Sequence, residues 1–436
     1  MGNLIRFVMT ALALAAAAAC SSGAASPVLT FSGSVVGREG EVIRRQLDRF
    51  QREHPSIRVA VRVTPDAADQ RHQLYVHWLN ARASEPDILQ LDVVWTPEFA
   101  AAGWIANLDR FHPALDAFFA PAVAAARWNQ SLYGLPWFVD VGMLYWRTDL
   151  VPHAPRDLRE LTSLAARGRD DRGVPFGFVW QGARYEGLVT VFLEYLGAFG
   201  GRVLDEHGGV TVDSEPAQRA LAAMYDAIYV DGVVPASVLT WQEEQTRFAF
   251  QNGQSVFMRN WPYAYGLLQE PGSTVAGRFA VAPMPAAPGG LPTATLGGSA
   301  LAINAHSDQP DDAYRLVDYL LRPEQMIERA RIAGEFPTRP ALYGTRELAA
   351  AVSMPPADAL AIIERATPRP ITPVYSQLSE ILQVSLHRAL TRQQSPRDAL
   401  REAAVGMRAL LAAARLGPLD SARAKPLDSA RGRPPA

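Results

Sequence analysis

Acidic, basic and aromatic side chains gather at turns in separate parts of the sequence. Asp92 directly follows an apolar stretch, Asp140 closes an apolar segment, and Arg369 stands between two prolines. Trp261 and Tyr263 flank a proline in a further aromatic cluster. Carboxylates and guanidinium groups bind pairs of neighbouring hydroxyls, and an aromatic ring packs on C–H groups. These residue types suit a sugar, although composition alone gives a pattern of low specificity.

Several other kinds of chemistry are excluded by the residues that the chain lacks. The sole lysine is Lys425, near the C-terminus, whereas a phosphate-binding P-loop and a pyridoxal Schiff base each need a lysine in their site. The nearest histidines, His72 and His77, do not share a helix face, so no zinc site is visible. Gly297-Gly298-Ser299 lacks the second glycine of a nucleophile elbow. We therefore expect no metal, no cofactor and no covalent catalysis.

The single cysteine, Cys20, closes an apolar N-terminal run that follows Arg6 and ends in small residues. This is the layout of a signal peptide, and the run is shorter than the roughly 20 residues that span a bilayer. The segment resembles a bacterial lipobox, which predicts a signal peptide over residues 1–19, lipidation of Cys20, and a lipidated tether over 20–27. The alternative is an ordinary cleaved signal with a leftover thiol. Either way, the mature chain works outside the cytoplasm.

The first part of the mature chain alternates between strand and helix patterns. A short apolar strand at Val28–Phe31 is followed by a helix over Glu39–Glu53, and the next strand, helix and strand are expected over 57–63, 66–83 and 87–91. This order predicts an α/β layer with a largely parallel sheet, whose ligands sit beyond the carboxyl ends of its strands. Glu39, Arg71 and Asp92 all follow such strand ends.

A second α/β body is expected to begin near Tyr133. Its predicted elements are a strand over 176–180, a helix over 187–199, and a helix from Pro216. A strand over 300–304 and a helix over 310–321 follow a loop rich in proline and glycine.

The formal charge of −2, without basic blocks, argues against nucleic-acid binding. Residues 415–436, with a short tandem repeat and no apolar period, are expected to be a disordered tail.

Several motifs together carry a family resemblance over about residues 28–411. They are Leu91-Asp92-Val93-Val94-Trp95-Thr96-Pro97-Glu98-Phe99 with Ala102-Gly103-Trp104, Tyr133-Gly134-Leu135-Pro136-Trp137-Phe138-Val139-Asp140 with 144–150, Phe257-Met258-Arg259-Asn260-Trp261-Pro262-Tyr263, Gly297-Gly298, and Arg369-Pro370-Ile371-Thr372-Pro373-Val374-Tyr375. The chain resembles the bacterial extracellular solute-binding proteins of sugar ABC importers, and in particular the trehalose/maltose-binding lipoprotein branch.

The resemblance implies an α/β protein with a two-lobed periplasmic-binding-protein fold (type II, Venus-flytrap) and a ligand cleft between the lobes. The implied first lobe comprises residues 28–135 and 300–340, and the second 136–299 and 341–414. Such a protein is not an enzyme. It closes around a glucose-containing disaccharide and delivers it to the permease subunits of an importer that has a cytoplasmic ATPase. We expect a monomer, anchored to the membrane by its lipid in the cell envelope.

The resemblance also assigns roles to single residues. Asp92 and Asp140 are implied sugar ligands, Trp261 stacks on a glucose ring with Tyr263 beside it, and Arg369 reaches sugar hydroxyls. Further ligand-binding positions are Glu39, Arg71, and the Gly297-Gly298 turn. The first lobe is expected to supply Glu39, Arg71 and Asp92, and the second Asp140, Trp261, Tyr263 and Arg369. Phe138 and Ala68 depart from the branch's pattern, because each stands where a hydroxyl side chain is used.

Other readings of these residues remain open. Asp92 and Glu39 also suit a helix N-terminus, Trp261 and Tyr263 a core, and Arg71 and Arg369 a solvated surface. Asp140 also suits a structural ion pair, and Gly297-Gly298 a simple turn. At the level of function, the rivals are an exported glycoside hydrolase that uses an Asp92–Asp140 pair, and a receptor that binds sugar for signalling alone.

Overall fold

The computed structural model of the protein describes residues 28–290, 292, 294–352 and 354–414. The predicted signal peptide, Cys20 with its tether, and the predicted tail at 415–436 lie outside the described residues. Within the described ranges, no helix has both the length and the apolar character needed to cross a membrane.

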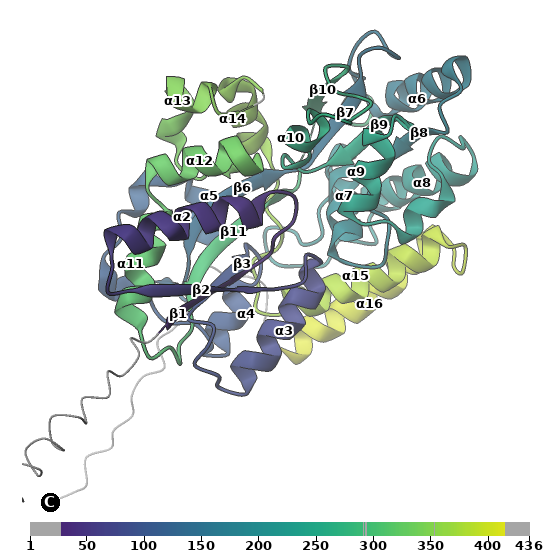
Figure 1. The fold of residues 1–436 in the computed structure, drawn as a ribbon. Coiled ribbons are helices and arrows are strands. Elements are labelled where there is room, and N and C mark those ends of the chain that lie inside the picture. Colours follow the sequence, from purple (N-terminus) through teal and green to yellow (C-terminus); the bar gives the residue numbers. More distant parts are fainter. Residues whose placement is uncertain (1–27, 291, 293, 353, 415–436) are drawn as a thin grey trace, which may run out of the picture.

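A six-stranded sheet forms the centre of the first lobe, in the strand order β12-β6-β11-β3-β1-β2 (Figure 1). Its strands are β1 (Val28–Gly33), β2 (Arg58–Val63), β3 (Ile88–Asp92), β6 (Leu135–Val141), β11 (Leu296–Ile303) and β12 (Phe336–Pro337). The predicted parallel pairing holds for β2, β1 and β3. Strands β11 and β12, for which the sequence predicted no direction, run antiparallel to their neighbours. Strand β11 differs because the chain returns to it from the other lobe, so it enters the sheet at the end where β6 leaves it.

Amphipathic helices cover this sheet. Helix α2 spans Glu39–Glu53, as predicted, and it buries Val42, Leu47 and Phe50 because these residues recur on one helical face. The other elements of this lobe are α3 (Ala68–Asn80), α4 (Thr96–Ala101), η1 (Asp109–Phe111), η2 (Leu115–Ala117), α5 (Ala120–Ala125), β4 (Arg127–Trp128), β5 (Ser131–Leu132), α11 (Pro310–Leu320), α12 (Pro323–Ala333), η4 (Pro340–Gly344), α13 (Arg346–Ala349) and α14 (Pro356–Arg365).

The second lobe is built on a four-stranded sheet in the order β10-β7-β9-β8, drawn mainly in teal in Figure 1. Its strands are β7 (Met143–Arg147), β8 (Phe176–Val179), β9 (Ser255–Asn260) and β10 (Phe279–Pro283). Its helices are α6 (Leu158–Arg172), α7 (Glu186–Ala198), α8 (Glu215–Tyr229), η3 (Ala236–Thr240), α9 (Glu243–Gln251), α10 (Ala264–Leu268), α15 (Tyr375–Leu390) and α16 (Pro396–Ala413). Helices α15 and α16 pack against each other and against α8, so the end of the described chain completes this lobe.

The lobe boundaries differ from those expected from the sequence. Leu296 pairs with Val141 and Gly297 with Asp140, so residues 136–141 and 296–299 belong to the six-stranded sheet. Helix α14 packs against η4 and β6, which places it on the first lobe as well. The second lobe therefore begins after β6 and resumes after α14. The first difference arises because the crossing strands β6 and β11 pair with each other, and β11 also pairs with β3.

A buried ion pair lies beneath the crossing segments. Arg259 Nε donates to Glu194 Oε2 at 2.9 Å, and both side chains are 0% exposed. A Cβ atom on Gly142, between β6 and β7, would lie 1.8 Å from the Glu194 carboxylate. The backbone amide of Thr295, just before β11, faces the same carboxylate at 3.5 Å. The pair thus joins α7 and β9 to two of the segments that connect the lobes.

We expect Arg259→Met to lower the free energy of unfolding by about 3–5 kcal/mol, because it leaves a buried carboxylate without its cation. Urea unfolding followed by circular dichroism measures this loss. Arg388→Met is the matched control, since Arg388 pairs with Glu402 at 3.1 Å on an exposed surface, where a pair contributes about 1 kcal/mol or less. Equal losses in the two variants would contradict a structural role for the buried pair.

Candidate ligand-binding site

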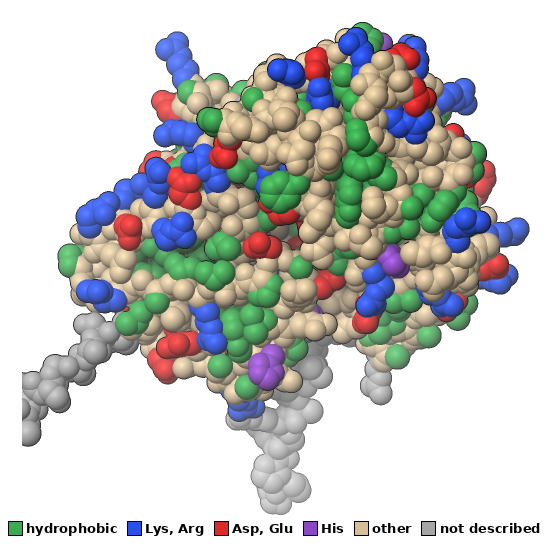
Figure 2. All heavy atoms as spheres, turned by 45° about the vertical axis from the view of Figure 1, so that its right-hand side comes forward, with side chains coloured by type: hydrophobic (Ala, Val, Ile, Leu, Met, Phe, Trp, Pro, Cys, Tyr) green, Lys and Arg blue, Asp and Glu red, His purple; other side chains and the backbone are tan. Residues whose placement is uncertain are grey.

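A cavity of about 330 Å³ lies between the two lobes. Figure 2 shows acidic side chains in the hollow between the two halves of the molecule. Every position that the sequence singled out lines this cavity: Glu39, Arg71, Asp92, Asp140, Trp261, Tyr263, Gly297, Gly298 and Arg369. The two departures from the family pattern, Phe138 and Ala68, line it too. Residues from both lobes therefore meet at one place.

The first lobe contributes its residues from the ends of strands, as the parallel-sheet rule predicts. Asp92 is the last residue of β3, and Glu39 begins the helix that follows β1. Asp140 was expected on the second lobe, which is wrong: it lies on β6 and pairs with Gly297 in the six-stranded sheet. The sequence motif correctly placed Asp140 next to the segment that crosses between the lobes. Which sheet Asp140 joins depends on the strands that pair in the folded protein.

Arg369 links the lobes through two carboxylates. Its Nη2 donates to Asp92 Oδ1 on the first lobe, and its Nη1 donates to Glu186 Oε1, at 2.7 Å, on the second. Glu186 also accepts a hydrogen bond from the Tyr375 hydroxyl at 2.7 Å. Arg369 is 4% exposed, and its Nε has no hydrogen-bond partner. The guanidinium is thus fixed by both lobes, which contradicts the reading of Arg369 as a solvated residue.

The base of the cavity is acidic. Burial and the nearby carboxylates of Glu39 and Asp92 together raise the pKa of Asp140 to about 7, although Arg259 and Arg329 oppose the shift. Asp140 Oδ1 is buried without a hydrogen-bond partner, whereas Glu39 accepts a hydrogen bond from the Ser34 hydroxyl. Glu335 also lines the cavity; burial raises its pKa well above the ordinary value, although Arg329 opposes this. All three acids line the cavity, and Asp140 and Glu335 each keep one buried acceptor without a partner.

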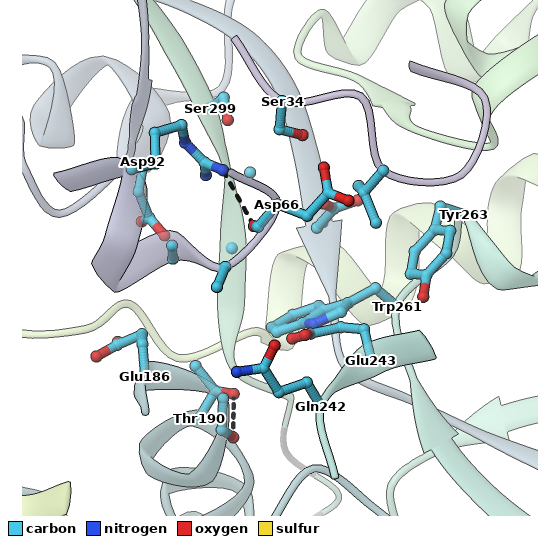
Figure 3. A pocket seen from close by; sticks show the side chains of 18 of the residues that line it. Ser34, Asp66, Asp92, Glu186, Thr190, Gln242, Glu243, Trp261, Tyr263 and Ser299 are labelled. Atoms are coloured by element: carbon cyan, nitrogen blue, oxygen red, sulfur yellow. Dashed lines mark hydrogen bonds between the residues drawn. The ribbon is translucent and has the colours of Figure 1, made fainter. Parts of the chain in front are cut away.

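An aromatic wall faces these acids. The Trp261 ring lies along the cavity in Figure 3, and the Arg259 guanidinium stacks on it at 3.9 Å from the ring centroid. Trp261 is half-buried, so part of the indole is open to a ligand. The Tyr263 hydroxyl donates to Glu244 Oε1 at 2.7 Å, which holds that ring in place. Gln242 and Glu243 lie beside Trp261 at the same wall.

The Gly297-Gly298 turn brings backbone to the cavity. Gly298 has a φ of +113°, and a Cβ there would lie 2.3 Å from the Phe138 carbonyl oxygen. Only glycine fits such a position without strain. At Gly297, a Cβ would lie 3.2 Å from the Trp261 ring. The lack of side chains at this turn therefore leaves the indole face uncovered.

Arg71 is positioned by backbone carbonyls. Its Nη1 donates to the carbonyl oxygens of Pro65, at 3.2 Å, and Asp66, at 3.1 Å, and the second of these bonds is drawn in Figure 3. The Arg71 guanidinium also lies 5.4 Å from the Trp95 ring centroid. Its Nε atom is buried without a partner. Arg71 is therefore a fixed cation at the cavity wall.

Sequence reasoning missed several lining residues, which are Ser34, Asp66, Thr190, Gln242, Gln245, Glu186, Glu243 and Ser299. Glu186 is the most consequential of these, because it holds Arg369. Its signal, a carboxylate at the first turn of an apolar helix, is shared by many helices that bind nothing. Among the residues that the structure describes, no group of histidine, cysteine and carboxylate side chains could hold a metal ion.

Comparisons with known proteins relate the chain to transport proteins. The family described as bacterial extracellular solute-binding protein matches residues 36–327. A probable ABC transporter-binding protein of Deinococcus radiodurans is 35% identical over 405 residues, which cover 89% of this chain and 95% of the relative. The solved structure of maltose-bound T. maritima MalE3 is 41% identical, with a TM-score of 0.84, and covers 88% of this chain and 99% of that one. A Thermotoga lettingae solute-binding protein bound with α-D-tagatose shares the fold, at 23% identity and a TM-score of 0.81 over 88% of this chain and 99% of that one.

We expect the raised pKa of Asp140 to appear in the pH dependence of stability. Between about pH 4 and 7 the folded state holds a proton on Asp140 that the unfolded state has released, so this residue makes stability fall as pH rises. Asp140→Asn removes that loss. The melting temperature of the variant relative to wild type should therefore be higher at pH 8 than at pH 5.

Asp149→Asn provides a control of opposite sign. A hydrogen bond from Arg147 lowers the pKa of Asp149, so its carboxylate stabilises the fold above its pKa. That variant should lose stability relative to wild type at both pH 5 and pH 8. A pH-independent difference for Asp140→Asn would show that Asp140 titrates normally.

Proposed function

Because the chain belongs to the bacterial extracellular solute-binding protein family, we propose that it is the substrate-binding lipoprotein of a carbohydrate ABC importer. We propose further that its ligand is a glucose-containing disaccharide such as maltose or trehalose. The observation that carries the proposal is the inter-lobe cavity, in which carboxylates, an arginine and an open indole face line one space.

The chemistry of the cavity walls supports this ligand class. Asp140, Glu39 and Arg71 offer acceptors and donors for hydroxyl pairs, and Trp261 offers a flat apolar face for the C–H groups of a sugar ring. A cavity of about 330 Å³ lies at the small end of the usual range for ligand pockets, roughly 300–1,000 Å³. A small saccharide, rather than a long polymer, suits this compartment.

In the proposed mechanism, the ligand shifts the protein towards its closed form. The acids at the base of the cavity and Arg71 belong to the first lobe, whereas Trp261 and Tyr263 belong to the second. A sugar contacts both sets of residues in the closed form alone, so its binding energy favours closure. The closed protein, which is held to the envelope membrane through Cys20, would then deliver the sugar to the permease subunits. A cytoplasmic ATPase would serve these subunits.

Asp140 gives one specific reason to test the rival hydrolase function, because a carboxyl with a raised pKa is suited to act as a general acid. Asp92, its potential partner, is instead ion-paired with Arg369. We therefore expect no hydrolysis: prolonged incubation with maltose, followed by chromatography, should release no glucose above a protein-free control. Glucose release that is lost in Asp140→Asn would establish a glycosidase.

The carrier function is tested with Trp261→Ala. We expect at least a tenfold loss of maltose affinity by isothermal titration calorimetry, because the ring face for the sugar is removed, with little change in melting temperature. Trp78→Ala is the matched control, since Trp78 also carries a guanidinium, that of Arg62, at 3.9 Å from its ring centroid but lies outside the cavity. A large loss of stability with intact binding would identify Trp261 as a core residue.

The ligand itself is identified by a thermal-shift screen of disaccharides. A sugar that binds the folded state raises the melting temperature, by an amount that grows with its concentration relative to Kd. Maltose or trehalose should produce such a shift in wild type and a smaller one in Trp261→Ala. The absence of a shift with every glucose disaccharide would contradict the proposed ligand class.

A further inference from the structure

Two glycines of the first lobe lie against the second-lobe segment Pro262-Tyr263. Gly37, between β1 and α2, has a φ of +56°, and a Cβ atom there would lie 2.8 Å from Cδ2 of the Tyr263 ring. Gly334, which follows α12, has a φ of +77°, and a Cβ atom there would lie 2.9 Å from the Pro262 carbonyl oxygen. A real Cβ atom does not come this near another heavy atom. The first lobe therefore approaches this segment so closely because both positions lack a side chain.

The segment is fixed to the second lobe on both sides of Pro262. The Tyr145 hydroxyl on β7 donates to the Trp261 carbonyl oxygen at 2.7 Å. The Tyr263 hydroxyl donates to Glu244 Oε1 on α9, also at 2.7 Å, and the Tyr263 side chain is buried. Trp261 and Tyr263, which both line the inter-lobe cavity, are therefore carried by the second lobe as one unit (Figure 3).

Gly37 belongs to the loop that presents first-lobe residues to the cavity. The Glu39 backbone amide donates to the Val36 carbonyl oxygen at 3.1 Å, so Gly37 lies inside the turn that begins α2. Ser34, Val36 and Glu39 line the cavity, whereas Gly37 is exposed and lies outside it. Gly37 thus contacts the second lobe beside the candidate site and has no place in the site itself.

We propose that Gly37 is a positioning residue for closure of the lobes. Its missing side chain lets Tyr263 come against the first lobe, so that Trp261 reaches a ligand held by Glu39. A side chain at position 37 would keep the lobes apart without touching the ligand, and it would lower affinity by reducing the population of the closed form. This inference rests on the proposed function, since it requires a ligand that both lobes contact.

A side chain at position 37 has two effects, which can be separated. The left-handed backbone strains any residue other than glycine, but this strain lies within the first lobe and is the same in the open and closed forms. It therefore lowers stability and leaves affinity unchanged. The contact with Tyr263 requires the lobes to be together, so it lowers affinity. Gly103, also on the first lobe, has a φ of +71°, and a Cβ atom there would have no described atom beyond its chain neighbours within 4 Å. Gly103→Ala thus reproduces the strain without the contact.

The test is maltose affinity by isothermal titration calorimetry of the full-length protein. Gly37→Ala should lose about tenfold, whereas Gly103→Ala should stay within about twofold of wild type although both variants melt at a lower temperature. In a Tyr263→Ala background, Gly37→Ala should change affinity by less than about twofold, because the ring that its Cβ meets is gone.

Small-angle X-ray scattering tests the conformational step directly. At a maltose concentration about tenfold above the Kd of wild type, wild type and Gly103→Ala should both reach the smaller radius of gyration of the closed form. Gly37→Ala should remain between the ligand-free and closed values, because its closed form is less populated.

The outcomes separate this inference from the proposed function. Unchanged affinity in Gly37→Ala, an equal loss in Gly103→Ala, or a Gly37→Ala loss that persists in full in the Tyr263→Ala background would each overturn the role of Gly37. Maltose binding by wild type would leave the carrier function intact in all three cases. Failure of wild type to bind maltose would contradict the proposed ligand and, with it, this inference.

Discussion

The arrangement of the cleft depends on Arg369, whose guanidinium is buried between carboxylates of opposite lobes. A cation that is removed from water needs close partners, and Asp92 and Glu186 supply them from the first and second lobe respectively. This requirement holds the end of β3 against the start of α7. Glu186 lines the cavity of about 330 Å³ and also a neighbouring cavity between the lobes. One ion cluster thus links the two lobes at the candidate site.

Polar contacts join the lobes across the cleft. They include the Arg369 cluster, the Asp69 cap on α7, and the Glu98–Ser376 hydrogen bond. Polar groups exchange such partners for water at small net cost, whereas a large apolar interface would close permanently. Buried apolar side chains pack around both sheets in one cluster, which includes Phe31 of the first lobe and Phe178 of the second. Polar contacts across the cleft, beside this continuous apolar packing, suit a protein whose closure is governed by its ligand.

The sequence predicted local structure better than it predicted pairing between distant segments. Helix α2 was predicted with the observed bounds, because its apolar period is regular. The direction of β11 and the lobe of Asp140 were missed, since both depend on which strand lies next to which in the folded sheet. The predicted site residues all line one cavity, because the family motifs carry tertiary information that periodicity lacks. Glu186 escaped notice, since its partner Arg369 is 183 residues away.

The acids at the base of the cleft are explained better by ligand binding than by a contribution to the stability of the fold. Asp140 Oδ1 and Glu335 Oε1 are buried without hydrogen-bond partners, and burial raises the pKa of both side chains. An unpartnered buried acceptor costs about 1–3 kcal/mol, and an apolar residue at Asp140 would avoid that cost. At Glu335 an apolar residue would instead leave the buried guanidinium of Arg329 without its ion-pair partner. A ligand that brings hydroxyl donors would supply the missing partners. In the proposed function, the stability that the free protein loses at Asp140 would be recovered on binding, which would make this residue a source of affinity.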